Sequence, residues 1–167
     1  MKFAIEHPFT GVDLPAYEAL YFDEPFNEAL CAKLGLQRTV NKLTRTGARL
    51  QRVCRIVPQR EIPAPEAKLM GDGHLVYTET LDYSWGSMGG TWKTVTDLLP
   101  DKVLCAGNFA FVGQAGGGVM RRIDGEVKVK IFAVGGMIER FIVADVERSY
   151  AAAATFTQAW IDGLQGA

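Results

Sequence analysis

The chain has 167 residues, of which 48% are hydrophobic and 22% charged, and its formal net charge is −1. This length suits one domain with a single core, spanning residues 1–167, and the composition argues against extended disorder. The lysines and arginines are scattered and matched by acids, which argues against binding of nucleic acid, because such binding needs a basic face. No apolar run is long enough to span a bilayer, so we expect no integral membrane segment.

The start of the chain and its cysteines indicate the cellular compartment. Charge and proline appear within residues 1–8, too early for a signal peptide. Cys31, Cys54 and Cys105 are widely spaced, lack a CxxC pairing and lie among apolar neighbours. This pattern is typical of buried thiols in a reducing compartment, not of disulfides or a zinc site. We therefore expect a cytoplasmic protein.

One strand and two short helices are predicted first. Residues 2–9 show the alternation that indicates a strand. Asp13 is followed by a leucine and a proline, and this N-cap pattern predicts a short helix through Leu20. The same signal recurs at Asp23, and the apolar spacing after it predicts a second helix, which Gly35 ends.

The middle of the chain follows the period of two that is typical of strands. A hairpin is predicted from Leu36–Thr46 and Ala48–Val57, which meet at Gly47. Residues 58–73 hold three prolines and two glycines and are the least regular stretch. The remaining predicted strands are 74–85, 91–99, 102–112 and 119–134, with a turn at 86–90 and a glycine-rich loop at 113–118.

The pair Asp124-Gly125 lies inside the last predicted strand and has two interpretations. It is either a two-residue hairpin turn or a bulge in one long bent strand. We favour the bulge, because it leaves a strand long enough to pair along the helix that follows.

The C-terminal stretch is predicted to be one long helix. After Gly135-Gly136, apolar residues recur at spacings of three and four from Ile138 to Leu164, which places them on one stripe. Such a helix is roughly 40 Å long, and alone it would expose the whole stripe to water. The preceding strands must therefore cover it. The predicted fold is α+β, a curved antiparallel sheet around the C-terminal helix.

This layout resembles the helix-grip fold of the START-like (SRPBCC) superfamily, which includes the birch-pollen allergen, lipid-transfer START domains and bacterial polyketide cyclases. The segments most similar to one uncharacterised bacterial branch, a domain-of-unknown-function family, are 22–26, 58–63, 124–131 and 134–139. The resemblance covers essentially the whole chain. It implies a seven-stranded antiparallel sheet with a hydrophobic cavity between sheet and helix. It does not specify function, because the superfamily includes carriers, cyclases, hydrolase activators and allergens.

Several motifs carry no assignable chemistry. The glycine-rich loop 113–118 is followed by a strand, whereas a phosphate-binding loop needs a helix N-terminus behind it. His7 and His74 lack further ligands at a definable spacing for a metal. The serines lack the context of a nucleophile elbow. We therefore assign no catalytic residue, metal or cofactor.

Glu79 is the most informative titratable residue. It shares a strand face with Tyr77 and Tyr83, and on a concave face it would lie among aromatics with a raised pKa. Such a carboxyl group acts as an acid or base, or anchors the polar end of a ligand. The alternatives are that the two faces are reversed, or that Glu79 pairs with Arg52 or Arg122.

The leading functional hypothesis is binding or transport of a hydrophobic small molecule or lipid between the sheet and the C-terminal helix. We expect the ligand to enter between the two short helices and residues 58–73. The candidate ligand-binding residues are Tyr77, Glu79, Tyr83, Trp92 and Arg122 from the sheet, and Phe141 and Tyr150 from the helix.

Two further hypotheses use the same scaffold. One is a cyclase or dehydratase that uses Glu79 or Tyr77 as acid or base, although the sequence shows no convincing acid–base pair, so we favour a binding protein over an enzyme. The other is an interaction protein with a filled core, in which Trp160 and Ile161 dock a second copy. A homodimer, through a sheet edge or a helix face, fits all three hypotheses.

Overall fold

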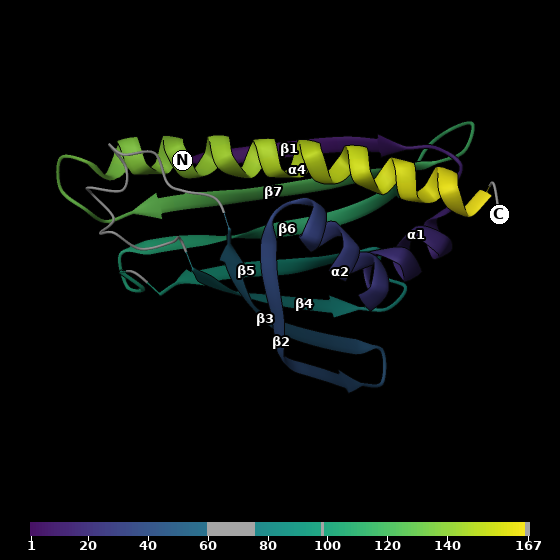
Figure 1. Ribbon diagram of the computed structural model, residues 1–167, viewed down its shortest axis with the longest axis horizontal. Helices are drawn as coiled ribbons and strands as arrows, with labels where there is room; N and C mark the ends of the chain where they lie inside the picture. The colour runs from purple at the N-terminus through teal and green to yellow at the C-terminus, as the bar shows by residue number, and fades with distance from the viewer. Residues whose placement is uncertain (60–75, 98, 166–167) are drawn as a thin grey trace.

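The computed structural model describes residues 1–59, 76–97 and 99–165, and its centre is one antiparallel sheet (Figure 1). The seven strands lie in the order β1-β7-β6-β5-β4-β3-β2. Their bounds are β1 Lys2–Phe9, β2 Leu36–Thr46, β3 Arg49–Pro58, β4 Tyr77–Ser84, β5 Gly89–Thr96, β6 Val103–Gly113 and β7 Val119–Val129. Among these described strands, only β1 and β7 are neighbours in the sheet without being consecutive in the chain. The seven-stranded helix-grip architecture is confirmed.

Two short helices connect β1 to β2, and their ends follow the predicted signals. Helix α1 is Leu14–Tyr21, and the Asp13 side chain accepts a hydrogen bond from the Ala16 amide at 2.8 Å. Helix α2 is Glu24–Lys33, and Asp23 accepts from the Phe26 amide at 2.9 Å. Each carboxylate satisfies a backbone donor that has no partner within its helix.

The long helix α4, Gly135–Gln165, runs along β1 and β7, as Figure 1 shows. Its apolar residues enter one core with the inward side chains of the sheet, among them Ile138, Ile142 and Ile161. Glu139, near the start of α4, accepts a hydrogen bond from the Val129 amide at 2.8 Å and binds the amino terminus at 3.0 Å. Within the described residues, the helices lack the combination of length and apolar sequence that crossing a bilayer requires.

Three predicted strands are longer than the observed ones. The last strand ends at Val129 and not at Val134, because residues 132–134 turn and Ala133 adopts a positive φ of 65°. Strand β5 ends at Thr96, and Leu98 of its predicted extension lies outside the described residues. So do residues 74–75 of the predicted fourth strand and residues 60–73 of the irregular stretch.

The Asp124-Gly125 pair is neither a hairpin turn nor a bulge, so both interpretations were wrong. Strand β7 pairs without a register shift with β1 and β6, and Gly125 lies opposite Gly107. A Cβ on Gly107 would lie 1.9 Å from the Asp124 carbonyl oxygen, and one on Gly125 would lie 2.5 Å from the Trp92 ring. Gly125 is therefore required where the Trp92 and Phe3 rings pack against β7, and not for a turn. The one bulge in the described strand pairings lies in β2, between Val40 and Lys42.

This close packing generates a prediction for Gly107→Ala. The new methyl group must displace backbone, because no rotamer change moves the Asp124 carbonyl away, and we expect the free energy of unfolding to fall by about 1–3 kcal/mol. Urea denaturation of the variant and of the parent protein measures the difference. Gly136→Ala is the matched control, since a Cβ there meets no atom within 4 Å. Equal unfolding midpoints for the two variants would contradict the packing argument.

Candidate functional site

A cavity of about 360 Å³ lies between the concave face of the sheet, the two short helices and α4. Its size is at the lower end of the range for small-molecule sites, roughly 300–1,000 Å³. Most of its wall is apolar or aromatic. Representative wall residues are Leu20, Phe26 and Leu30 from the short helices, Ile56, Thr94, Val103 and Cys105 from the sheet, and Ile142, Val146 and Ala153 from α4.

The structure places most of the predicted ligand-binding residues on this wall. Tyr77, Glu79 and Trp92 reach it from β4 and β5, and Phe141 and Tyr150 reach it from α4. The alternation in β4 therefore assigned its inward face correctly. Their contact with a ligand stays a prediction.

Arg122 does not line the cavity. Its side chain is 54% exposed on the outer face of β7, where it forms an ion pair with Glu6 at 2.8 Å. The neighbouring Arg121 takes the inward position, because Val119, Arg121 and Ile123 share the buried face of the strand. The regular spacing of the apolar residues in β7 was the signal that separates the two arginines.

Tyr83 is inward but belongs to the packed core beside the cavity. It is 5% exposed, and its ring stacks on Phe109 with centroids 5.7 Å apart. Its hydroxyl donates a hydrogen bond to Glu18 at 2.6 Å, and Glu18 also accepts from the Gly86 amide at 2.6 Å. Burial, with the Glu18 carboxylate, raises the pKa of Tyr83, so the phenol stays protonated at neutral pH.

Glu79 faces the cavity, and the two arginines considered as its partners contact other acids. Arg52 lies 3.7 Å from Glu24, and Arg122 is bound to Glu6. Burial raises the pKa of Tyr150, and the charge of Glu79 adds to that shift. Glu79 and the protonated hydroxyl group of Tyr150 therefore belong to the same cavity wall.

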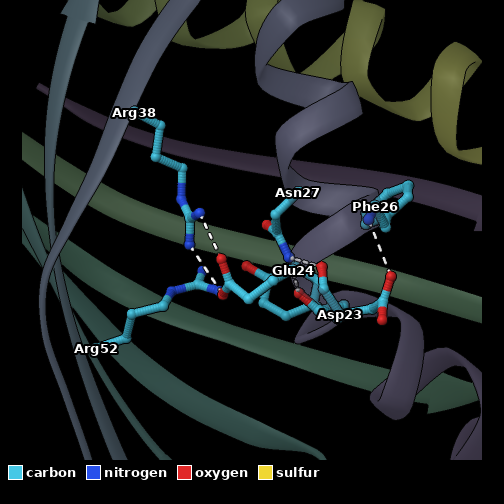
Figure 2. Close-up of polar contacts among 7 residues, drawn as sticks. Asp23, Glu24, Phe26, Asn27, Arg38 and Arg52 are labelled. Carbon is cyan, nitrogen blue, oxygen red and sulfur yellow. Dashed lines mark hydrogen bonds and ion pairs between the residues drawn. The ribbon is translucent and has the colours of Figure 1, made fainter.

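An ion cluster that the sequence analysis did not find joins α2 to the wall (Figure 2). Glu24 accepts two hydrogen bonds from Arg38 on β2, at 2.7 and 3.2 Å, and lies 3.7 Å from Arg52 on β3. The side chains of Arg38 and Arg52 are only 8% and 6% exposed. The Arg38 hydrogen bond lowers the pKa of Glu24. One carboxylate thus serves two buried guanidinium groups, and the Nε and Nη1 atoms of Arg52 have no hydrogen-bond partner among the described residues.

Arg121 is a third buried cation of the wall, at 3% exposed. Its guanidinium carbon lies 5.2 Å from the Phe9 ring centroid and 5.3 Å from that of Tyr150. It contacts the Nδ1 atom of His7 and the Tyr150 carbonyl, each at 3.5 Å. Desolvation, with the charge of Arg121, lowers the pKa of His7, which keeps that imidazole neutral at pH 7.

The three cysteines lie at buried or half-buried positions. All three are free thiols, and burial raises their pKa values, which keeps them protonated at neutral pH. Within residues 1–59, 76–97 and 99–165, no three His, Cys, Asp or Glu side chains are grouped to hold a metal ion.

Comparison with known sequences assigns the family. Residues 6–161 match the family described as "Protein of unknown function (DUF2505)". The chain belongs to this family. A search of curated proteins finds no match for this DUF2505 chain.

Solved structures share the fold of the DUF2505 chain at low sequence identity. The protein TTHA0849 from Thermus thermophilus is 12% identical with a TM-score of 0.68, covering 98% of this chain and 99% of that one. The Zhui aromatase/cyclase from Streptomyces sp. R1128 is 9% identical with a TM-score of 0.64, covering 97% and 94%. A norcoclaurine synthase mutant from Thalictrum flavum, in complex with a transition-state analogue, is 14% identical with a TM-score of 0.59, covering 99% and 94%.

The ion cluster at Glu24 predicts a stability effect. Glu24→Gln leaves Arg38 and Arg52 buried without a carboxylate, and we expect a loss of about 1–3 kcal/mol, below the value for a fully buried pair because Glu24 is 38% exposed. The folded-state pKa of Glu24 is lowered. The contribution of the Glu24 carboxylate to the free energy of unfolding is therefore complete above the pKa of Glu24 in the unfolded chain. It is lost as pH falls through the pKa of Glu24 in the folded protein.

Urea unfolding of the parent and of Glu24→Gln, at neutral and at acidic pH, measures both effects. Glu28→Gln is the matched control, because Glu28 is an exposed carboxylate on the same helix. The stability difference between parent and Glu24→Gln should shrink on acidification, and a difference that stays constant with pH would contradict the assignment.

Proposed function

We propose that this protein binds a small hydrophobic molecule in the cavity between the sheet and α4. The observation that supports the proposal is the cavity itself, about 360 Å³ with a mostly apolar and aromatic wall. A hydrophobic molecule that enters it leaves water, which favours binding by roughly 25 cal/mol for each Å² of apolar surface buried. A few polar wall groups, among them Glu79 and Tyr77, would orient it.

The comparisons support the same proposal at the level of the fold. The norcoclaurine synthase structure holds a transition-state analogue, so a protein of this fold accommodates a small organic molecule. The competing hypothesis of a filled core required a packed interior, which the cavity argues against. A lipid as the ligand, a homodimer and a cytoplasmic location stay predictions, and the free thiols support the last of these.

Native mass spectrometry of freshly purified protein tests the binding proposal. We expect a stoichiometric extra mass that leaves on denaturing extraction, and the released molecule then identifies the ligand. The same spectrum reports whether the protein is a homodimer. An apo mass, with no thermal stabilisation by fatty acids, sterols or polyketides, would overturn the proposal.

A pair of alanine variants on α4 tests where the molecule binds. Ala153 is 6% exposed on the cavity wall, whereas the neighbouring Ala152 is exposed and does not line the cavity. We expect Ala153→Phe to fill cavity space and reduce the bound mass at least about tenfold, while Ala152→Phe keeps it. Circular dichroism verifies that both variants are folded. Equal ligand content in the two variants would place the ligand elsewhere.

A second candidate function is acid–base catalysis of a cyclisation or dehydration in the same cavity. The specific observation in its favour is that Glu79 faces the cavity together with Tyr77, as an acid–base mechanism requires. The aromatase/cyclase and the synthase with the same fold agree with this candidate.

The test for catalysis is to incubate the protein with the molecule that extraction identifies and to analyse its mass over time. If the protein is an enzyme, Glu79→Gln should lower the rate by about 10²–10⁴-fold, and Glu126→Gln, an exposed carboxylate on β7, should leave it unchanged. Recovery of the unaltered molecule after prolonged incubation would leave binding as the function.

A further inference from the structure

Two buried arginines in the cavity wall are incompletely neutralised by the protein. Arg52 on β3 and Arg121 on β7 are 6% and 3% exposed. A guanidinium group stays protonated in proteins, so its charge is present even when it is buried. A buried charge is costly unless it is paired and hydrogen-bonded. The partners of these two arginines therefore indicate what the cavity is suited to receive.

The polar contacts of Arg121 are to neutral groups. They are long, 3.5 Å to the His7 ring nitrogen and 3.5 Å to the Tyr150 carbonyl oxygen, and its Nε atom has no hydrogen-bond partner in the described structure. The lowered pKa of His7 follows from desolvation and from the Arg121 charge, so His7 does not compensate that charge. Across the part of the chain that the structure describes, no carboxylate forms an ion pair with Arg121.

Arg52 shares its carboxylate partner with Arg38. Both close oxygen contacts of Glu24 go to Arg38, at 2.7 and 3.2 Å, and Arg52 lies at 3.7 Å. The Nε and Nη1 atoms of Arg52 remain without hydrogen bonds to any described residue. Two guanidinium groups that face one partly exposed carboxylate leave an excess of positive charge at this part of the wall.

The remaining charged wall residues do not remove this excess. Arg148 is bound to Asp145 at 3.3 Å, so these two offset each other. Glu79 is the acid that remains on the described wall, and in the described residues it forms no ion pair with Arg52 or Arg121. Four arginines (Arg38, Arg52, Arg121 and Arg148) therefore stand against three acids (Glu24, Glu79 and Asp145), and the described interior of the cavity is positive overall.

We propose that the ligand of this cavity is an organic acid, an apolar body with a carboxylate that Arg121 binds. Its carboxylate would supply the charge that Arg121 lacks and accept hydrogen bonds from the guanidinium, which binds carboxylates in a bidentate manner. Its apolar body would lie against the aromatic wall, and Arg52 would receive a second oxygen atom. This inference rests on the proposed function and narrows it from any hydrophobic molecule to an anionic one.

Matched pairs of probes test the inference: decanoate against decanol, and naphthoate against naphthamide. Isothermal titration measures each affinity. We expect the acid of at least one pair to bind about 10- to 100-fold more tightly than its neutral counterpart, because a hydrogen-bonded charge pair in a dry site is lost with the neutral molecule. Arg121→Gln should abolish this preference, because it lowers the affinity for the acid and changes the affinity for the neutral probe little.

Arg122→Gln is the matched control, since it removes the same charge one residue away on the exposed face. Arg121→Lys keeps the charge but loses the planar fork, so part of the acid preference should remain. The comparison of acid and neutral probes on the parent protein tests the inference even if Arg121→Gln does not fold. Neutral probes that bind as tightly as the acids would overturn the inference and leave the proposed function standing.

A preference for acids that survives in folded Arg121→Gln would also overturn the role of Arg121. If no probe of either kind binds and the purified protein carries no small molecule, the proposed function itself fails, and the inference with it. These outcomes are distinguishable, because the neutral probes report on the cavity alone and the acids report on the arginines.

Discussion

The apolar stripe of α4 is the constraint on which the rest of this structure depends. A helix of 31 residues cannot bury that stripe by itself, so the sheet must curve around it. The first and last strands are neighbours under the helix, so the amino-terminal strand pairs with the strand that leads into α4. Glu139 joins these parts, because it binds both the amino terminus and the Val129 amide.

The cavity exists because side chains fill the space between the sheet and the helices unevenly. An aromatic cluster that includes Phe22, Tyr83, Phe109 and Phe111 fills the region beneath the short helices. Beside this cluster the space between α4 and the sheet stays open, and small side chains such as Thr94 and Ala153 are part of its wall. The same fold therefore contains both a packed aromatic core and a cavity, because the side chains do not fill all the space between the curved sheet and the helix.

Protein stability alone does not explain the buried arginines of the cavity wall. Buried arginines cost free energy when their partners are incomplete, and apolar residues of similar volume would cost less. Arg121 is stabilised partly by the rings of Phe9 and Tyr150, and Arg52 partly by Glu24. What these neighbours do not supply is a full set of acceptors. Recognition of an anionic ligand gives a reason for arginine at both positions.

Much of the fold was predictable because its signals are local. The caps at Asp13 and Asp23, the hairpin at Gly47 and the long helical stripe each depend on residues close in sequence, and all were confirmed. The inward face of β4 was predictable for the same reason. The role of Gly125 was not, because a glycine that makes room for the Trp92 and Phe3 rings looks in sequence like one that makes a turn.

The sequence by itself determined the α+β architecture, the strand periodicity and the inward face of β4, since these follow from the alternation of apolar residues along each element. Only the tertiary structure decided which cations enter the cavity. Arg52 and Arg121 lie on different strands and share no local motif, and Glu24 reaches Arg38 and Arg52 only after α2 has packed on the sheet. Long-range pairing of charges depends on strand order and curvature, and no periodicity within a segment encodes either.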